Sequence, residues 1–144
     1  MRAHLAGIAA ATALVVAGCT GSTPAQTTSS AGGSETAQRH PDILEVDLTR
    51  TAPETFSVAV TVSSPYDSPS RYADGWRVLD EDGVVLGEHT LTHDHAGEQP
   101  FTRTQSGLTI PDDVAEVTVE GRDQEYGYGG GTVTVPVPHE ATSP

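Results

Sequence analysis

The chain has 144 residues, with seven arginines, no lysine and 20 carboxylates, which gives a formal net charge of −13. This length leaves room for one domain once the polar ends are set aside. A surface so acidic repels nucleic-acid phosphates and anionic lipid headgroups, so we expect no nucleic-acid partner.

The N-terminus has the pattern of an export signal. Arg2 and His4 precede an apolar stretch over residues 5–17. This stretch is about as long as the apolar region of a signal peptide and is too short to cross a bilayer as a helix. We therefore predict a cleaved signal peptide over residues 1–18.

The apolar stretch ends in Val16-Ala17-Gly18-Cys19, which contains the one cysteine of the chain. One thiol cannot form an internal disulfide, so Cys19 needs another explanation. Small residues before a cysteine resemble a bacterial lipobox, in which the sulfur receives diacylglycerol and the cysteine becomes the mature N-terminus. The resemblance implies a lipid on Cys19 that anchors the protein to the membrane, at the cell surface or the periplasmic face. The alternative is an ordinary secretory signal with an incidental cysteine.

Polar segments set the limits of the folded part. Residues 20–39 are mostly Thr, Ser, Gly, Ala, Gln and Pro without apolar periodicity, which is typical of a flexible linker. We predict the lipidated cysteine and this linker over residues 19–40, a folded domain over residues 41–138 and a disordered tail over residues 139–144.

Within the folded part, apolar and polar residues alternate with a period of two, which is typical of strands with one buried face. Seven such strands are expected, at residues 43–48, 56–62, 76–79, 84–86, 101–110, 114–120 and 132–137. In the first, Leu44, Val46 and Leu48 share one face and are expected to point inward. In the last, Pro136 predicts an edge strand, because proline cannot donate to a sheet.

Short strands with turn signals about every 8–12 residues predict an all-β fold, an immunoglobulin-like or fibronectin-III-like β-sandwich. Asp82-Gly83 between two apolar runs indicates a hairpin turn. Trp76 resembles the buried core tryptophan of that architecture. No segment after the signal peptide has the apolar stripe of a helix. A small barrel or a jelly-roll fragment is the alternative.

If successive strands run up and down, the connections at residues 63–72, 91–100 and 123–131 emerge at the same end. They carry the four tyrosines of the chain, Tyr66, Tyr72, Tyr126 and Tyr128. Tyrosine gives amphipathic contact area at low entropic cost, so we predict that these four bind a ligand. The alternative for the last connection is a flexible hairpin loop whose glycines supply positive φ angles.

The second of these connections contains His93-Asp94-His95. On an extended segment, residues i and i+2 point the same way, so both imidazoles could reach one metal ion. His89 has the same parity and Glu98 could add an oxygen, which makes these four residues a candidate site for zinc or copper. The alternative is two exposed histidines in a polar loop, with no cofactor bound.

No catalytic residues are expected. A hydrolytic metal site also needs a cleft, an open coordination position and a placed base, and the sequence indicates none of these. It also has no nucleophile elbow around a serine. We therefore predict that the protein is not an enzyme.

Two stretches resemble a group of uncharacterised bacterial secreted proteins and lipoproteins. They are Ala73-Asp74-Gly75-Trp76-Arg77-Val78, followed by Gly83 and Gly87, and then His93-Asp94-His95-Ala96-Gly97-Glu98-Gln99-Pro100-Phe101-Thr102-Arg103. The resemblance covers about half of the folded part and implies an intact single domain. It marks the histidine loop as the most distinctive stretch and transfers no catalytic residue.

Three functions remain open at this point. The first is a lipid-anchored, extracytoplasmic binding module that recognises a protein or another envelope ligand through the loops at one end of the sandwich. The second is a transition-metal-binding lipoprotein that uses the His93-Asp94-His95 loop. The third is a passive structural spacer.

Overall fold

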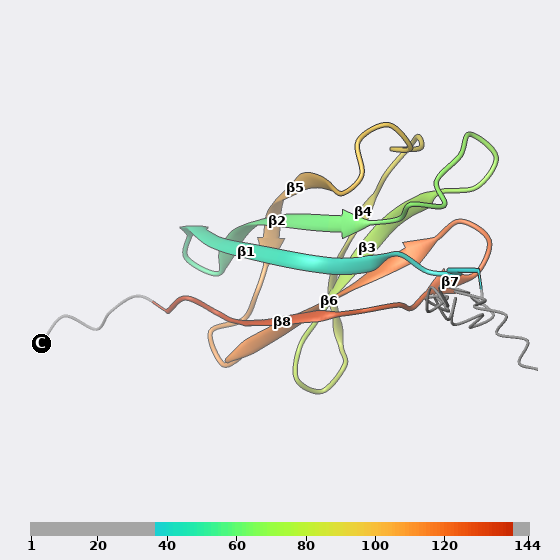
Figure 1. Cartoon of the computed structure of the whole chain (residues 1–144). Helices are drawn as coiled ribbons and strands as arrows, with labels where there is room; N and C mark the ends of the chain where they lie inside the picture. Colours follow the sequence, from blue (N-terminus) through green and yellow to red (C-terminus); the bar gives the residue numbers. More distant parts are fainter. Residues whose placement is uncertain (1–36, 140–144) are drawn as a thin grey trace, which may run out of the picture. The chain divides into compact units, whose positions relative to one another are not determined.

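The computed structural model describes residues 37–139. The predicted signal peptide, Cys19, most of the linker and the end of the tail lie outside these residues. The described chain forms eight β-strands: β1 (Asp42–Ala52), β2 (Thr55–Ser63), β3 (Ala73–Leu79), β4 (Val85–Thr90), β5 (Phe101–Thr109), β6 (Glu116–Asp123), β7 (Gly127–Tyr128) and β8 (Val133–Pro136) (Figure 1). It contains no helix, and therefore none that is long and apolar enough to cross a membrane.

The strands form two antiparallel sheets that face each other as a β-sandwich. The first sheet has the order β1-β2-β5, and the second has β4-β3-β6 with β7 and β8 both paired to β6. β8 pairs with the first half of β6 and β7 with its end, so the two together complete one edge of the second sheet. The all-β prediction is confirmed, with eight strands in the described residues in place of seven because the two-residue β7 forms within the predicted connection at residues 123–131.

The core lies between the sheets and follows the period-two pattern. Phe56, Val58, Val60 and Val62 of β2 are completely buried, as the alternation predicts. Trp76 of β3 is also completely buried, and its indole N–H donates to the Gln105 side chain at 3.0 Å. This hydrogen bond removes the cost of burying an unpaired donor, so the core can hold the large ring.

The expected inward face of β1 is wrong at Leu44. Ile43 is buried, whereas Leu44 is 53% exposed, because the pairing of β1 with β2 shifts by one residue between Ile43 and Glu45. A β-bulge of this kind adds one residue to the strand and reverses the side-chain parity before it. Val46 and Leu48, which follow the bulge, face the core as expected.

β4 is longer than the expected strand at residues 84–86. It begins at Val85 and continues through polar residues to Thr90, where the backbone pairs with Gly75 of β3. Val84 and Val85 are exposed. The apolar residues therefore predicted where the strand lies but not which of its faces is buried. The backbone ladder to β3 extends the strand, since hydrogen bonding in a sheet does not require apolar side chains.

The described chain begins and ends at opposite ends of the sandwich. At its start, the carbonyls of Gln38 and Arg39 accept hydrogen bonds from Arg71, in the loop between β2 and β3. At its end, the Pro138 carbonyl accepts one from Arg50, near the turn between β1 and β2. The end at which the chain starts also carries the loops with the tyrosines, and we call it the loop end (Figure 1).

Candidate functional site

Arg71 is the centre of the loop end. Its guanidinium carbon lies 4.2 Å from the centroid of the Tyr66 ring and 4.8 Å from that of Tyr126. Its Nε atom lies 3.2 Å from Oδ2 of Asp123, the last residue of β6. The cation therefore joins the connection between β2 and β3 to the connection between β6 and β7 by two cation–π contacts and an ion pair.

The Asp123 side chain is almost completely buried and contacts both Arg71 and backbone N–H groups. Its Oδ1 accepts hydrogen bonds from the backbone N–H groups of Glu125 and Tyr126, both at 2.9 Å. Burial alone would raise its pKa, but these hydrogen bonds, with Tyr66 and Arg71, outweigh burial and hold the pKa below the ordinary value. Burial first, and then the Asp123 carboxylate, raise the pKa of Tyr66 far above its ordinary range. The pair is thus a carboxylate beside a protonated phenol.

The same arginine holds the start of the folded chain. Its Nη2 atom donates to the carbonyl oxygens of Gln38 at 3.1 Å and Arg39 at 2.9 Å. The Arg39 guanidinium in turn lies 5.4 Å from the Tyr126 ring centroid. Tyr126 is 45% exposed, and its ring contacts the guanidinium groups of both Arg39 and Arg71.

The three consecutive glycines Gly129–Gly131 pack against the residues at the start of β1. The Gly131 N–H donates to Oδ1 of Asp42 at 2.6 Å, and the Ile43 N–H donates to the Gly131 carbonyl at 2.8 Å. Gly130 has a φ of 87°, and a Cβ atom there would lie 2.1 Å from the Pro41 carbonyl oxygen. Glycine is needed because the backbone approaches this closely in a left-handed conformation. Arg71, Tyr66, Tyr126, Asp123 and Gly129–Gly131 together form what we call the loop-end clasp.

The other two tyrosines make different contacts, although each adjoins a clasp residue in the sequence. Tyr128 of β7 stacks over Arg77 at 4.1 Å, and its hydroxyl donates to the Glu88 carboxylate. Burial and this hydrogen bond raise the pKa of Tyr128. Tyr72 is half-buried, and its carbonyl accepts a hydrogen bond from the Gln124 N–H. The structure therefore brings Tyr66 and Tyr126 together around Arg71 but does not gather all four tyrosines into one surface.

The histidine loop packs as part of the core. The His95 side chain is only 2% exposed and stacks on Phe101, with ring centroids 3.9 Å apart and planes 12° apart. Neither ring nitrogen has a hydrogen-bond partner in the described residues. Burial, followed by Arg103 and His93, lowers the pKa of His95. Burial therefore disfavours the protonated form of this imidazole.

The four candidate metal ligands are not gathered around one point. The His93 and His95 ring centroids lie 4.7 Å apart with planes 34° apart. His89 stacks on its cross-strand partner Trp76 with ring centroids 4.3 Å apart, and β4 ends at Thr90, before His93. Glu98 forms an ion pair with Arg103 at 2.5 Å. Within residues 37–139, no group of three or more His, Cys, Asp and Glu residues is arranged to hold a metal ion.

Sequence reasoning missed the residues that fix the histidine loop. The Asp67 side chain is buried and accepts hydrogen bonds from the N–H groups of Ala73 at 2.9 Å and His95 at 3.0 Å. Gln99 accepts one from the Ser64 N–H at 2.7 Å. An Asp in a Pro-rich loop indicates a turn. The hydrogen bond that Asp67 accepts from the His95 N–H, 28 residues later, could be found only from the fold.

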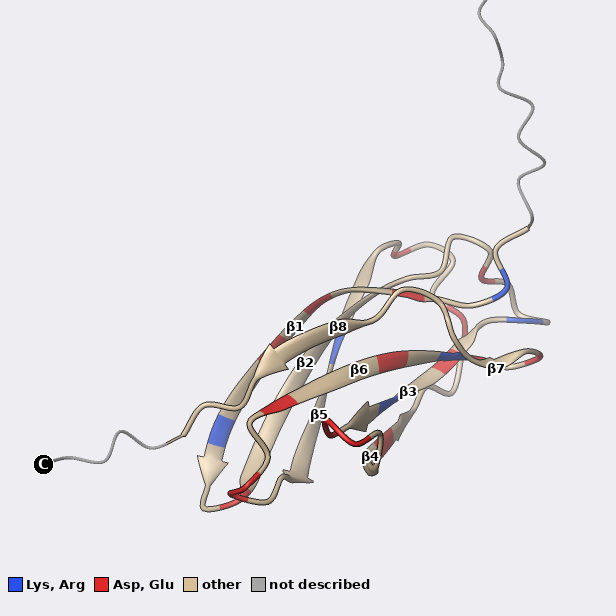
Figure 2. Cartoon of the chain, turned by 90° about the horizontal axis from the view of Figure 1, so that it is seen from below, with Lys and Arg blue, Asp and Glu red and all other residues tan. Residues whose placement is uncertain are grey.

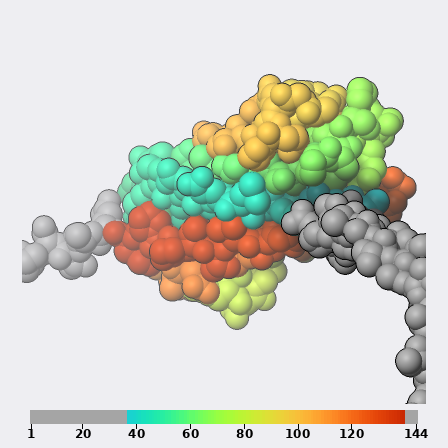
Figure 3. All heavy atoms as spheres, viewed as in Figure 1, coloured from blue at the N-terminus to red at the C-terminus, as the bar shows by residue number. Residues whose placement is uncertain are grey.

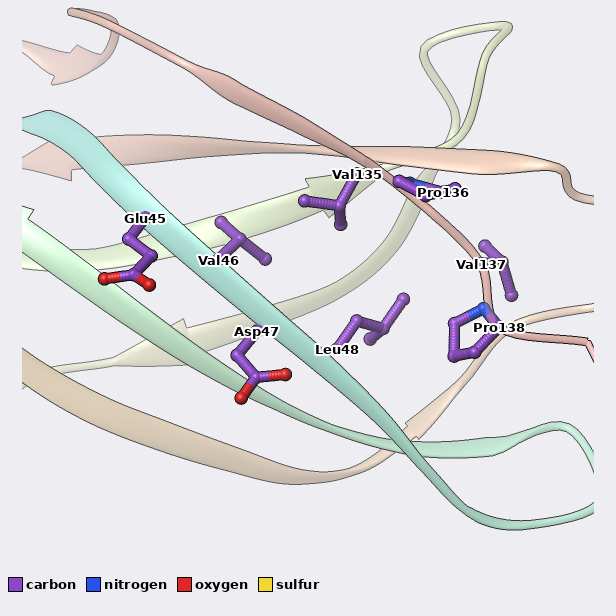
Figure 4. Close-up of a pocket in the computed structure, with 8 residues that line it drawn as sticks. All are labelled: Glu45, Val46, Asp47, Leu48, Val135, Pro136, Val137 and Pro138. Atoms are coloured by element: carbon purple, nitrogen blue, oxygen red, sulfur yellow. The ribbon is translucent and has the colours of Figure 1, made fainter.

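A second feature, absent from the sequence expectations, is a groove between β1 and β8. The two strands run side by side across one face of the molecule (Figure 3). The groove encloses about 380 Å³ and is lined by Glu45, Val46, Asp47, Leu48, Val135, Pro136, Val137 and Pro138. Val46 and Val137 are buried, and Leu48 and Val135 are partly buried against the core. We call it the β1–β8 groove (Figure 4).

Comparisons with known proteins give one informative similarity. A protein of Halomicrobium mukohataei named "Putative lipoprotein" is 33% identical to this chain over 109 residues, which is 76% of the chain. The chain covers 53% of that relative, so it spans about half of the relative's length. No family model matches the chain, and no solved structure matches it.

Proposed function

We propose that this protein is a lipid-anchored, extracytoplasmic module of the cell envelope that binds a partner protein and carries out no catalysis. Val16-Ala17-Gly18-Cys19 supports a lipid on Cys19, and the Halomicrobium relative carries the name of a lipoprotein. The observation that carries the proposal is the loop-end clasp, because it holds the residues through which the domain continues toward Cys19.

The clasp gives an anchored domain a firm attachment. A pull from the membrane would act on the residues before β1, and Arg71 and the glycine loop both bind those residues. Residues 20–36 separate Cys19 from the described chain and, fully extended, span at most about 60 Å. The chain leads toward Cys19 from the loop end, and we propose that the other surfaces of the sandwich are available to a partner.

The strand order favours a fibronectin-III-like sandwich as the finer fold. In constant-type immunoglobulin domains the fourth strand lies in the sheet of the first, second and fifth strands. Here β4 pairs with β3 in the other sheet. Domains of this architecture serve widely as recognition modules on cell surfaces, which is consistent with a binding role but, as an analogy of fold, does not choose the ligand.

The anchor is tested with the full-length chain expressed in a bacterial host that is fed an alkyne-tagged palmitate. We expect the wild-type chain to take up the tag and to sediment with membranes, and the Cys19→Ser chain to do neither. Protease added to intact spheroplasts should digest the wild-type domain, because it lies outside the cytoplasm. Equal labelling of the Cys19→Ser chain, or protection from protease, would contradict the proposal.

A second candidate function is transition-metal binding at the histidine loop. The observation that favours it is the pair of unpartnered ring nitrogens on buried His95, next to the His93 ring. Binding would require the loop to turn these rings toward one ion. Calorimetry of the full chain with zinc and with copper at neutral pH tests it. Micromolar binding that the His93→Ala/His95→Ala variant loses would support this function, and binding that is unchanged in the variant would end it.

A further inference from the structure

We infer that the order of the histidine loop (residues 91–100) is coupled to the binding of residues 38–40, which we call the entry segment. While Arg71 holds the entry segment, the histidine loop stays closed, and release of the segment loosens the loop. This inference rests on the proposed anchor for the source of the release, which is a pull from the membrane. The coupling itself depends only on contacts among the described residues.

The first contact joins the entry segment to residues 64–72, the connection between β2 and β3. Nη2 of Arg71 donates to the carbonyl oxygens of Gln38 at 3.1 Å and Arg39 at 2.9 Å. Arginine positions, shown in blue in Figure 2, lie at the end of the sandwich where the described chain begins. Both acceptors lie closer to Cys19 in the sequence than β1 does. A pull on the chain would therefore reach these two hydrogen bonds before it reached the sheet.

The connection between β2 and β3 is a compact unit. Its backbone forms a bridge in which the Ser68 N–H donates to the Arg71 carbonyl at 2.8 Å and the Arg71 N–H donates to the Ser68 carbonyl at 3.1 Å. The Asp67 N–H donates to the Ser64 carbonyl at 2.9 Å. The Arg71 guanidinium also lies over the Tyr66 ring. Because Ser68 follows Asp67 directly, a displacement of Arg71 is expected to move Asp67 as well.

The same connection holds the histidine loop from the other side. The buried Asp67 carboxylate accepts hydrogen bonds from the N–H groups of His95 at 3.0 Å and Ala73 at 2.9 Å. The Ser64 N–H donates to Oε1 of Gln99 at 2.7 Å, and Nε2 of Gln99 donates to the His95 carbonyl at 3.2 Å. A buried N–H that loses its acceptor is costly. The position of the connection thus decides whether the His95 backbone keeps its partners.

The histidine loop has few other attachments. It contains no strand, and most of its residues are exposed. In the described chain, the hydrogen bonds that leave residues 92–99, apart from the exposed Glu98–Arg103 pair, end on the connection between β2 and β3. The stacking of His95 on Phe101 is the main contact that remains. A segment held by so few bonds opens locally without global unfolding. Opening would present both rings to a partner.

The first test measures amide hydrogen exchange in residues 19–144 with Cys19→Ser, which keeps the chain in solution. In Arg71→Lys, one nitrogen cannot take the positions of both Nε, which faces Asp123, and Nη2, which donates to the entry segment. The His95 amide should exchange at least about tenfold faster. The matched control is Arg77→Lys, because Arg77 also pairs with a carboxylate and lies over a tyrosine ring. It should leave the His95 rate within about twofold of wild type.

The second test measures the coupling in the opposite direction, since linkage between two sites is reciprocal. Asp67→Asn leaves one oxygen where two accept backbone N–H groups. Trypsin under native conditions should then cleave after Arg39 at least about threefold faster, because cleavage requires the entry segment to leave Arg71. The matched control is Asp80→Asn, since Asp80 also accepts two backbone N–H groups, in the turn between β3 and β4. Its cleavage rate should equal that of wild type.

Three results would overturn the inference. An unchanged His95 rate in Arg71→Lys, or an equal increase in Arg77→Lys, would mean that Arg71 does not control the loop. A wild-type cleavage rate after Arg39 in Asp67→Asn would contradict reciprocity. Equal acceleration of the His95 amide and of the Val114 amide, which donates to the Pro111 carbonyl in a distant turn, would mean a general loosening. Failure of the proposed anchor is read separately, since these rates are measured on a chain that carries no lipid.

Discussion

At the loop end, one arginine contacts two tyrosines, a buried carboxylate and two backbone carbonyls. At the edge formed by β1 and β8, Glu45 and Asp47 line a groove and form no ion pair within residues 37–139. Both regions are rich in the residue types that sequence analysis associates with recognition. The loop end uses them for contacts within the chain, whereas the groove leaves them free, so the presence of tyrosine and charge in loops does not by itself identify a binding surface.

The largest effect is expected from Arg71→Ala. This substitution leaves buried Asp123 without its cation, and removing one member of a buried pair costs about 3 kcal/mol of the free energy of unfolding. Urea denaturation of the full chain measures it. The control is Arg103→Ala, whose ion pair with Glu98 is much more exposed and contributes at most about 1 kcal/mol. Equal losses in the two variants would mean that the clasp does not hold the loop end.

The second effect is expected from Gly130→Ala. Both Gly130 and Gly83 have positive φ angles, but only at Gly130 would a Cβ atom meet the Pro41 carbonyl oxygen at 2.1 Å. We expect Gly83→Ala to cost about 1 kcal/mol from backbone strain alone and Gly130→Ala to cost at least about 2 kcal/mol.

Hydrogen exchange locates the effect of Gly130→Ala. The amide of Ile43, which donates to Gly131, should exchange faster in the Gly130→Ala chain and at the wild-type rate in the Gly83→Ala chain. Uniformly faster exchange in both variants would show that the glycine loop does not specifically hold the start of β1.

The third effect is a dependence of stability on pH at the histidine loop. The folded chain holds the pKa of His95 below that of the unfolded chain, so the unfolded chain binds the proton first as pH falls. The free energy of unfolding should therefore decrease below about pH 6.5, with a slope of at most about 1.4 kcal/mol per pH unit from this residue.

His95→Phe isolates this contribution, because burial lowers the pKa of His89 as well. The free energy of unfolding of wild type minus that of His95→Phe should be constant above about pH 7. It should decrease below about pH 6.5, since only wild type loses stability from His95. Parallel pH profiles for the two chains would show that the His95 ring is not buried in solution.

The smallest effect is expected from Glu45→Gln/Asp47→Asn. These side chains are exposed and unpaired, so the free energy of unfolding should change by at most about 0.5 kcal/mol. Urea denaturation of the full chain measures this change. A loss of more than about 1 kcal/mol would show that the carboxylates support the fold.

Much of the fold could be predicted from the sequence. The alternation in β2 placed Phe56, Val58, Val60 and Val62 inward, and Pro136 placed the last strand at an edge. These predictions depend on local geometry, because the period of a strand fixes the face of each side chain. The prediction for Leu44 failed because a bulge depends on how β1 pairs with β2, and one sequence segment does not contain that information.

The candidate sites were harder to predict. His93 and His95 are close to each other, as their spacing predicts, but His95 is buried against Phe101, and half-buried His89 stacks on Trp76. Whether a histidine in a loop faces solvent or the core depends on residues far away in the chain. The Asp67 side chain, which fixes the His95 backbone from another loop, is one such residue.

The sequence by itself determined the all-β class and the identity of most buried positions, since both are read from composition or short-range spacing. Tertiary structure decided that Arg71 joins two loops to the start of the domain, and that β1 and β8, about 90 residues apart in sequence, form a groove. The physical reason is that strand edges and charge pairs are made by neighbours in space. Their sequence positions follow from topology rather than from any local pattern.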